Sequence, residues 1–402
     1  MEAFTEDLFI KRKCSLPYTS DTKKDKVQLD AHLLVDRGLQ HLDSNASELT
    51  EDELHHGIIF LATNLQAQPW NNSKLVKKAC HIYDKLIGVD GVRHLLNSNS
   101  KICKKVNKWI IQVLKRDSWQ EYASVYVLYR WYCSLLAFPQ VSEHLDVLIP
   151  PSLLLVDSYD DELKVAGVDC LCHIIQESGK TELRWHGRAE VIYDALQKLT
   201  YTQHEPLISL LHPTIIKIMK VLEDESALAA ERKVDSVYQR LLGDMYVEDK
   251  LVLRRTYALS AKLYIEYLKQ DVIKHLSQTI KTVIYYLEDS CGPLEITRTA
   301  MLEILQLLLT FGSPRIETHY IDITKALLRL VVDTVMLPID ADTSDNLVFR
   351  VATILQLMMA DGGCPYICES IRMIIANSPL MTNQKGQQVV AAMNRVIALL
   401  NT

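Results

Sequence analysis

The sequence predicts an all-α protein, an α-solenoid in which helical hairpins of the HEAT or armadillo type stack in a row. Apolar residues recur at three- and four-residue intervals along most of the chain, and the period-two alternation of a strand is hard to find. Glycine and proline, 13 and 12 of 402 residues, are too few for the many tight turns of an all-β fold. Short breaks with proline or glycine separate the periodic segments, as connections between helices do.

The helical body is expected to begin just after residue 50. Residues 1–50 are polar and weakly periodic, so we expect a partly disordered leader there and one helical-repeat domain over residues 51–402. Thr50 followed by Glu53 is the pattern of a capping box at a helix start. Apolar residues then continue at helical spacing as far as Pro69, which should stop this helix.

The segment from Asp161 to Glu177 shows the helical pattern most fully. Acidic residues occupy its first turn, where the helix dipole favours negative charge, and its apolar stripe is wide enough to need cover on both flanks. Helices of this kind are expected to begin at intervals of roughly 40–47 residues, the length of HEAT and armadillo repeats. The expected starts lie near Asp160, Pro206, Lys250 and Pro293. A compact irregular helical domain is the alternative architecture.

Charge and hydropathy argue against two classes of partner. The formal net charge is −6, whereas a nucleic-acid-binding protein is expected to be basic on its binding surface. No window of about 18 uninterrupted apolar residues occurs, so we expect no membrane-spanning helix. Basic residues gather in the leader, which is either a solubilising tail or a localisation or docking signal. They are Lys11, Arg12, Lys13, Lys23, Lys24 and Lys26.

The nine cysteines predict buried thiols and no metal. Cys170 and Cys172 are two residues apart on a predicted helix, so their side chains point in nearly opposite directions and cannot bind one ion. Cys364 and Cys368 have no second pair near them in the sequence, as a structural zinc site requires. An odd number of cysteines and no secretory signal indicate reduced thiols in a cytoplasmic and also nuclear protein.

The sequence lacks the motifs of the common enzyme classes. There is no phosphate-binding G-x-x-x-x-G-K-[ST] loop, no G-x-G-x-x-G after a strand, and no G-x-S-x-G nucleophile elbow. His55 and His56 precede an apolar run without the H-E-x-x-H spacing, and we expect them to be exposed or half-buried. We therefore expect no catalytic site and no cofactor.

Two segments look unlike ordinary core. Pro150 and Pro151 are adjacent, and because proline disfavours a helix interior we expect a fixed corner at a helix boundary. Asp157 and Tyr159 should then lie in the turn before the next helix, either as structural caps or as contacts with a partner.

The second segment holds two adjacent arginines, Arg254 and Arg255, within an apolar run. An unpaired buried charge is costly, so each guanidinium must reach solvent, an acidic partner or an internal ion pair. Arginine is also favoured at interfaces for its forked donor geometry. A partner contact and an internal salt bridge to a neighbouring hairpin both remain open.

Both segments also match a known family, and further pieces match it in the same order. The first match runs from Leu148 to Ile174 and includes Lys164 and Gly167, and the second, 253–258, includes Tyr257. Shorter matches between residues 55 and 335 are Gln68-Pro-Trp70, Ser118-Trp119, Leu287-Glu288, Gly292-Pro293 and Ala326-Leu-Leu-Arg-Leu330. The chain thus resembles the Tel-two-interacting protein two family, the smallest subunit of the TTT co-chaperone complex.

The resemblance implies a helical-repeat scaffold without catalysis or cofactor, assembled with the two larger TTT subunits. Through them it implies a link to the ninety-kilodalton heat-shock chaperone and to phosphatidylinositol-kinase-related kinases such as ATM and mTOR. Family-motif or interface residues are then Pro150, Pro151, Asp157, Tyr159, Lys164, Gly167, Arg254, Arg255 and Tyr257. The match departs from the family at both ends, with a shorter N-terminal region here and little similarity after Pro338. A stand-alone helical-repeat transport or cargo receptor is the alternative function.

Overall fold

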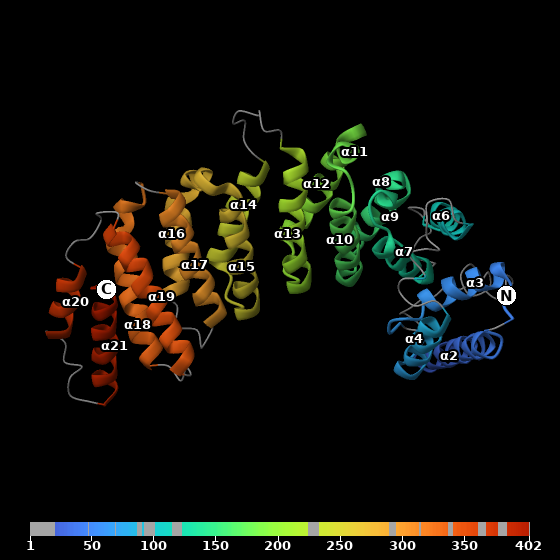
Figure 1. The fold of residues 1–402 in the computed structure, drawn as a ribbon, viewed down its shortest axis with the longest axis horizontal. Helices are drawn as coiled ribbons and strands as arrows, with labels where there is room; N and C mark the ends of the chain where they lie inside the picture. Colours follow the sequence, from blue (N-terminus) through green and yellow to red (C-terminus); the bar gives the residue numbers. More distant parts are fainter. Residues whose placement is uncertain are drawn as a thin grey trace. The chain divides into compact units, whose positions relative to one another are not determined.

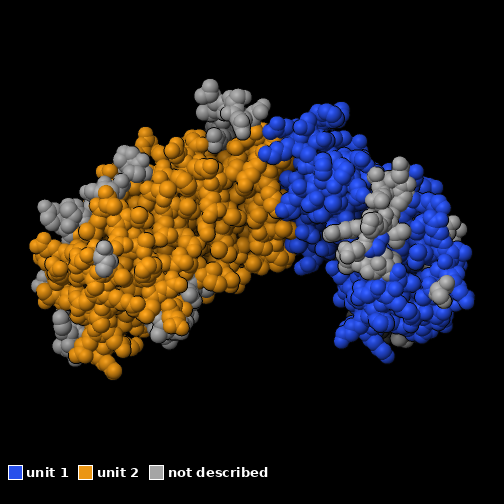
Figure 2. All heavy atoms as spheres, in the orientation of Figure 1, with its two compact units in different colours: residues 1–196 blue, residues 197–402 orange. Residues whose placement is uncertain are grey.

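The regular structure is helical throughout the described residues (Figure 1). The computed structural model describes residues 21–401 except 47, 69, 87–90, 92–100, 115–122, 224–232, 289–294, 313–314, 337–340, 361–366 and 377–383. The chain divides into two compact units, residues 1–196 and 197–402 (Figure 2). The sequence did not predict this division.

Unit 1 is a succession of helices that pack on their neighbours. Helices α2 and α3 both pack on α4, α3 and α6 pack on α7, and α7 and α9 pack on α10. The helices are α2 (Asp21–Ser44), α3 (Glu51–Ala62), α4 (Ser73–Leu86), α6 (Lys101–Val113), α7 (Ala123–Leu135), α8 (Gln140–Glu143), α9 (Leu145–Val156), α10 (Asp161–Gln176), α11 (Lys180–Arg184), the 3₁₀ turn η2 (Trp185–Gly187) and α12 (Arg188–Lys198), whose last residues belong to unit 2.

Helix α2 lies within the segment that the sequence analysis treats as a polar leader. It packs on α4, and two ion pairs join the helices, Lys78–Asp36 at 2.7 Å and Lys85–Asp43 at 2.8 Å. Three apolar residues at helical spacing are fully buried in it, namely Val35, Leu39 and Leu42. The helical structure therefore begins before residue 51, whereas residues 1–20 lie outside the described part of the chain.

The capping box predicted for α3 is confirmed. Thr50 Oγ1 accepts a hydrogen bond from the Glu53 amide at 3.4 Å, and the Glu53 carboxylate accepts one from the Thr50 amide at 3.0 Å. The hydrogen bonds that the carboxylate accepts from the Thr50 amide and the Thr50 hydroxyl lower the pKa of Glu53. The helix ends at Ala62, well before Pro69, because the side chains of Thr63 and Asn64 donate to the Phe60 carbonyl and replace its helical partner.

The expectation that His55 and His56 are exposed or half-buried is wrong, because both are buried. They lie in α3, which packs on α4 and α7. His56 Nε2 is 2.9 Å from the Lys105 ammonium nitrogen on α6, so a protein group replaces solvent as its partner. The short-range pattern around the two histidines does not show which helices cover them.

Unit 2 consists of two layers of helices. Helices α13, α15, α17 and α19 pack side by side in one layer and α14, α16 and α18 in the other, and α21 packs on both α18 and α19 (Figure 1). The helices are α13 (Glu205–Leu222), α14 (Lys233–Val247), α15 (Leu251–Leu268), α16 (Leu276–Glu288), α17 (Glu295–Gly312), α18 (Tyr320–Met336), α19 (Ala341–Ala360), α20 (Ile367–Ala376) and α21 (Gln384–Leu400), with 3₁₀ turns η3 (Leu199–Tyr201), η4 (Lys269–His275) and η5 (Arg315–His319). Each hairpin contributes one helix to each layer, which confirms the predicted all-α solenoid.

Three of the four predicted helix starts are confirmed. Asp160 is the N-cap of α10 and accepts a hydrogen bond from the Glu162 amide at 2.9 Å. Pro206 lies in the first turn of α13, where its missing N–H costs nothing, and Lys250 precedes the first residue of α15. The fourth, Pro293, lies outside the described residues.

The corner predicted at Pro150 and Pro151 is wrong, because both prolines lie inside α9. Their missing N–H groups leave two carbonyls of the preceding turn without their usual donors. The helix persists because α9 packs along α10, and the Tyr129 hydroxyl adds a tertiary hydrogen bond by donating to the Leu148 carbonyl at 2.6 Å, where it also contacts Ser152 Oγ. Tertiary packing here overrides the local preference of proline.

Candidate functional site

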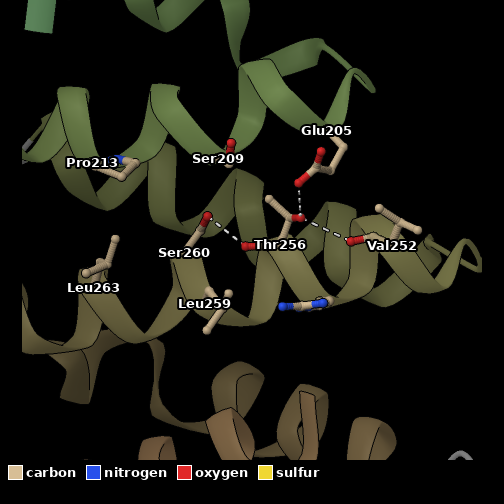
Figure 3. A pocket seen from close by; sticks show the side chains of 9 residues that line it. Glu205, Ser209, Pro213, Val252, Thr256, Leu259, Ser260 and Leu263 are labelled. Atoms are coloured by element: carbon tan, nitrogen blue, oxygen red, sulfur yellow. Dashed lines mark hydrogen bonds between the residues drawn. The ribbon is translucent and has the colours of Figure 1, made fainter. Parts of the chain in front are cut away.

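A groove of about 300 Å³ lies between α13 and α15 in unit 2 (Figure 3). One wall comes from α13 and the other from α15, the two neighbours of one layer. The lining residues are Glu205, Ser209 and Pro213 from α13, and Val252, Arg255, Thr256, Leu259, Ser260 and Leu263 from α15. The second sequence motif therefore forms part of a concave surface.

The polar groups of the α15 wall are largely occupied within the protein. Thr256 Oγ1 is 3.1 Å from the Val252 carbonyl oxygen and 3.4 Å from Glu205 Oε1. Ser260 Oγ donates to the Thr256 carbonyl at 2.9 Å. Val252, Leu259 and Leu263 supply the other side chains of this wall besides Arg255. The α15 wall therefore offers mainly apolar surface apart from Arg255.

The α13 wall contains a proline with a structural consequence. Pro213 lies inside α13 and has no N–H, so the carbonyl of Ser209 lacks its usual donor four residues on. Both residues line the groove (Figure 3). A backbone carbonyl in this position is an acceptor for a donor from outside the helix.

The structure separates the two adjacent arginines. Arg254 is 4% exposed, and its guanidinium carbon lies 4.3 Å from the ring centroid of Tyr286 and 5.2 Å from that of Tyr285, both on α16. Arg255 is exposed in the groove and makes no ion pair with any residue that the structure describes. Consecutive helical residues point about 100° apart, so one arginine stabilises the contact between two helices and the other faces outward.

We expect this difference to show in stability. Arg254→Met should lower the free energy of unfolding by about 2 kcal/mol, because it removes a desolvated cation from two aromatic rings. Arg255→Met should change it by less than about 0.5 kcal/mol, as at other exposed positions. Urea denaturation followed by circular dichroism measures both, and equal losses for the two variants would contradict the separation.

The first sequence motif lies in unit 1, around the turn between α9 and α10. Asp157 ends α9 and is exposed, and Tyr159 is 98% exposed. Lys164 pairs with Asp161 one turn earlier in α10, at 2.7 Å. The two motifs therefore belong to different units, and a partner contact at Asp157 and Tyr159 stays a prediction. Tyr257 of the second motif is core, and its burial raises its pKa to about 12.

Gly167 allows α10 to approach α9 closely. A Cβ atom placed on it would lie 2.8 Å from the Val156 backbone nitrogen and 2.9 Å from the Ser152 carbonyl oxygen. Real Cβ atoms essentially never come this close to backbone atoms, so residue 167 must be glycine for these helices to keep their distance. The family match singles out this residue, and the packing of the helices supplies its physical reason.

A charged ladder across three helices of unit 2 was missed by the sequence analysis. Glu303 on α17 accepts from Lys262 on α15 at 2.9 Å and from Arg350 on α19 at 3.1 Å. The hydrogen bond from Lys262 is the largest cause of the lowered pKa of Glu303. The partners are separated by 41 and 47 residues, about one repeat, so complementary charges at the repeat spacing are the signal that points to them.

Over the described residues, no three His, Cys, Asp or Glu side chains gather closely enough to hold a metal ion. None of the helices in that part of the chain combines the length and apolarity needed to cross a membrane.

Cys170 and Cys172 are both buried although they point apart, so α10 is covered on two sides as predicted. A hydrogen bond with Cys133, together with burial, raises the pKa of Cys170. Cys364 lies outside the described residues.

The stacked hairpins define an α-solenoid, a protein built of helical repeats. A family model described as the Tti2 family matches residues 107–294, a range that contains both motifs. The resemblance to the Tel-two-interacting protein two family is therefore confirmed.

The chain is also similar to curated proteins named TELO2-interacting protein 2. TELO2-interacting protein 2 from Homo sapiens is 29% identical over 296 residues, which cover 70% of this chain and 58% of that protein. The Rattus norvegicus protein of this name is 30% identical, with coverages of 68% and 56%. The chain thus spans a little over half the length of the curated relatives it matches. A solved circular tandem repeat protein with novel repeat topology matches at 13% identity and a TM-score of 0.20, over 94% of this chain and 88% of that one, too weakly to bear on fold or function.

Proposed function

We propose that this chain is a non-catalytic scaffold subunit of the TTT co-chaperone complex, bound to the two larger subunits. The observation that carries the proposal is the Tti2 family match over residues 107–294. The name of these curated relatives, TELO2-interacting protein 2, supports TELO2 as one of the partners. We place the protein in the cytoplasm and also in the nucleus.

The physical basis of such a function is a stable surface. In a stack of hairpins each repeat contacts only its neighbours, so the array leaves long exposed faces to which a partner can bind. In unit 2 the ladder of Lys262, Glu303 and Arg350 connects three consecutive helices of one such face. This layer also carries the groove, which supports the assignment of a binding role to it.

The proposal extends to the fate of client kinases. A scaffold in a maturation pathway acts through its clients, and a large client that folds slowly through exposed intermediates is degraded when assembly fails. Together with the ninety-kilodalton heat-shock chaperone, the complex would then maintain the amount of phosphatidylinositol-kinase-related kinases. The family resemblance is what supports this extension.

A pull-down of the tagged full chain from cells, with quantitative mass spectrometry, tests the proposal. We expect both larger TTT subunits in stoichiometric amounts, and on depletion of the chain we expect lower kinase protein levels with unchanged transcripts. A monodisperse protein that recovers neither subunit would instead favour a stand-alone helical-repeat cargo receptor.

A further inference from the structure

The outward face of α15 leaves apolar side chains uncovered beside the groove. Val252 is 63% exposed and Leu259 is 44% exposed, one helical turn before and after Arg255. Exposed apolar side chains that line a groove are typical of an interaction site.

Arg255 contrasts with the cations of the charged ladder. The cations of the charged ladder, Lys262 and Arg350, are both held by Glu303. Glu205, the carboxylate of the groove, lies on the α13 wall and has Thr256 as a neighbour at hydrogen-bond distance (Figure 3). Among the described residues no carboxylate forms an ion pair with Arg255. Its guanidinium is therefore available to bind an anion from another molecule.

The chemistry around Arg255 favours a protein over a nucleic acid as the source of that anion. One guanidinium between apolar side chains does not make the row of cations that phosphate backbones require, and the chain is net acidic. Arginine at the centre of an apolar surface is instead a common anchor between proteins. Its fork can bind a carboxylate through two parallel hydrogen bonds.

We propose that the α13–α15 groove binds an apolar and acidic segment of a larger TTT subunit, with a carboxylate on Arg255 and an apolar side chain between Val252 and Leu259. A donor of the segment would bind the Ser209 carbonyl, which lacks its usual helical partner. This inference rests on the proposed function and names the surface that performs it.

Binding assays with the two larger TTT subunits, co-expressed and purified as a complex, test the groove. Arg255→Glu should weaken the affinity of the full chain by about tenfold or more, because it places like charges together. Leu259→Asp should also weaken the affinity, and Arg255→Lys should weaken it less because the positive charge remains. The matched control is Arg372→Glu, since Arg372 is an exposed helical arginine of unit 2 outside the groove. Circular dichroism establishes that each variant is folded.

The outcomes separate the inference from the proposed function. If the wild-type chain binds and folded Arg255→Glu and Leu259→Asp bind as well as Arg372→Glu, the groove is not the docking surface, while the proposed function stands. If the wild-type chain does not bind, the proposed function fails and the inference falls with it. If light scattering shows a wild-type dimer that Arg255→Glu dissociates, a second copy occupies the groove. If ribonuclease treatment abolishes binding by the wild-type chain, RNA occupies the groove.

Discussion

Replacing Gly167 with Ala is expected to lower the free energy of unfolding by about 3 kcal/mol, an unusually large effect for a single methyl group. The added Cβ atom would lie 2.8 Å from the backbone nitrogen of Val156 and 2.9 Å from the Ser152 carbonyl oxygen. Backbone atoms within a helix cannot rotate away as a flexible side chain can. Helix α10 would therefore have to move away from α9, opening the packing that buries Val168 and Leu171.

Gly243 in α14 offers the matched control. A Cβ atom there meets no neighbour within 4 Å, and the residue is exposed in a helix. Gly243→Ala should therefore stabilise the protein by up to about 1 kcal/mol, through the higher helix propensity of alanine. Thermal and urea denaturation give the two changes, and hydrogen exchange should locate the loss for Gly167→Ala in α9 and α10. A Gly167→Ala variant as stable as the wild-type protein would show that the crossing can widen at little cost.

Unit 2 is expected to lose stability as the pH falls from about 6.5 to about 4, because of His212. This residue is buried in α13, and its Nδ1 lies 3.0 Å from the hydroxyl oxygen of Tyr264 on α15. The ring of Tyr238 on α14 stacks on that of Tyr264. Burial lowers the pKa of His212 to about 4, because a positive charge has little solvation there.

The direction of this pH dependence follows from the protonation of His212 in the folded and in the unfolded state. In the unfolded chain a histidine has a pKa of about 6.5, so below that pH the unfolded state binds a proton that folded His212 does not accept. The contribution of His212 is therefore complete above pH 6.5 and is lost progressively down to its folded pKa of about 4. A difference of about 2.5 pKa units corresponds to about 3 kcal/mol.

His212→Gln isolates this contribution, because glutamine keeps a polar group near Tyr264 and does not titrate. Between about pH 7 and about pH 5 the wild-type protein should lose about 2 kcal/mol more stability than the variant, as measured by urea denaturation. The control is His81→Gln, the same replacement at an exposed histidine of α4, which should keep the wild-type pH dependence. Equal losses for His212→Gln and the wild-type protein would show that His212 is not the group responsible.

Features whose causes lie within one or two helical turns were predicted from the sequence. The capping box at Thr50 and Glu53 depends on residues three apart, and the starts of α10 and α13 depend on acidic or proline residues at the N-cap or in the first turn. The helical period itself is a local property, so the all-α class followed from it. Even the burial of Cys170 and Cys172 on two sides of α10 follows from the width of the apolar stripe.

Features that depend on the neighbouring helices were decided by the tertiary structure alone. The sequence does not show that Arg254 meets two tyrosines while Arg255 faces a groove, because the aromatic partners come from another helix. The same reason accounts for buried His56 and for the two prolines that remain helical within α9. Periodicity shows which residues share a face of a helix. The packing of the other helices determines whether that face is covered, by which side chains, and how closely the backbones approach.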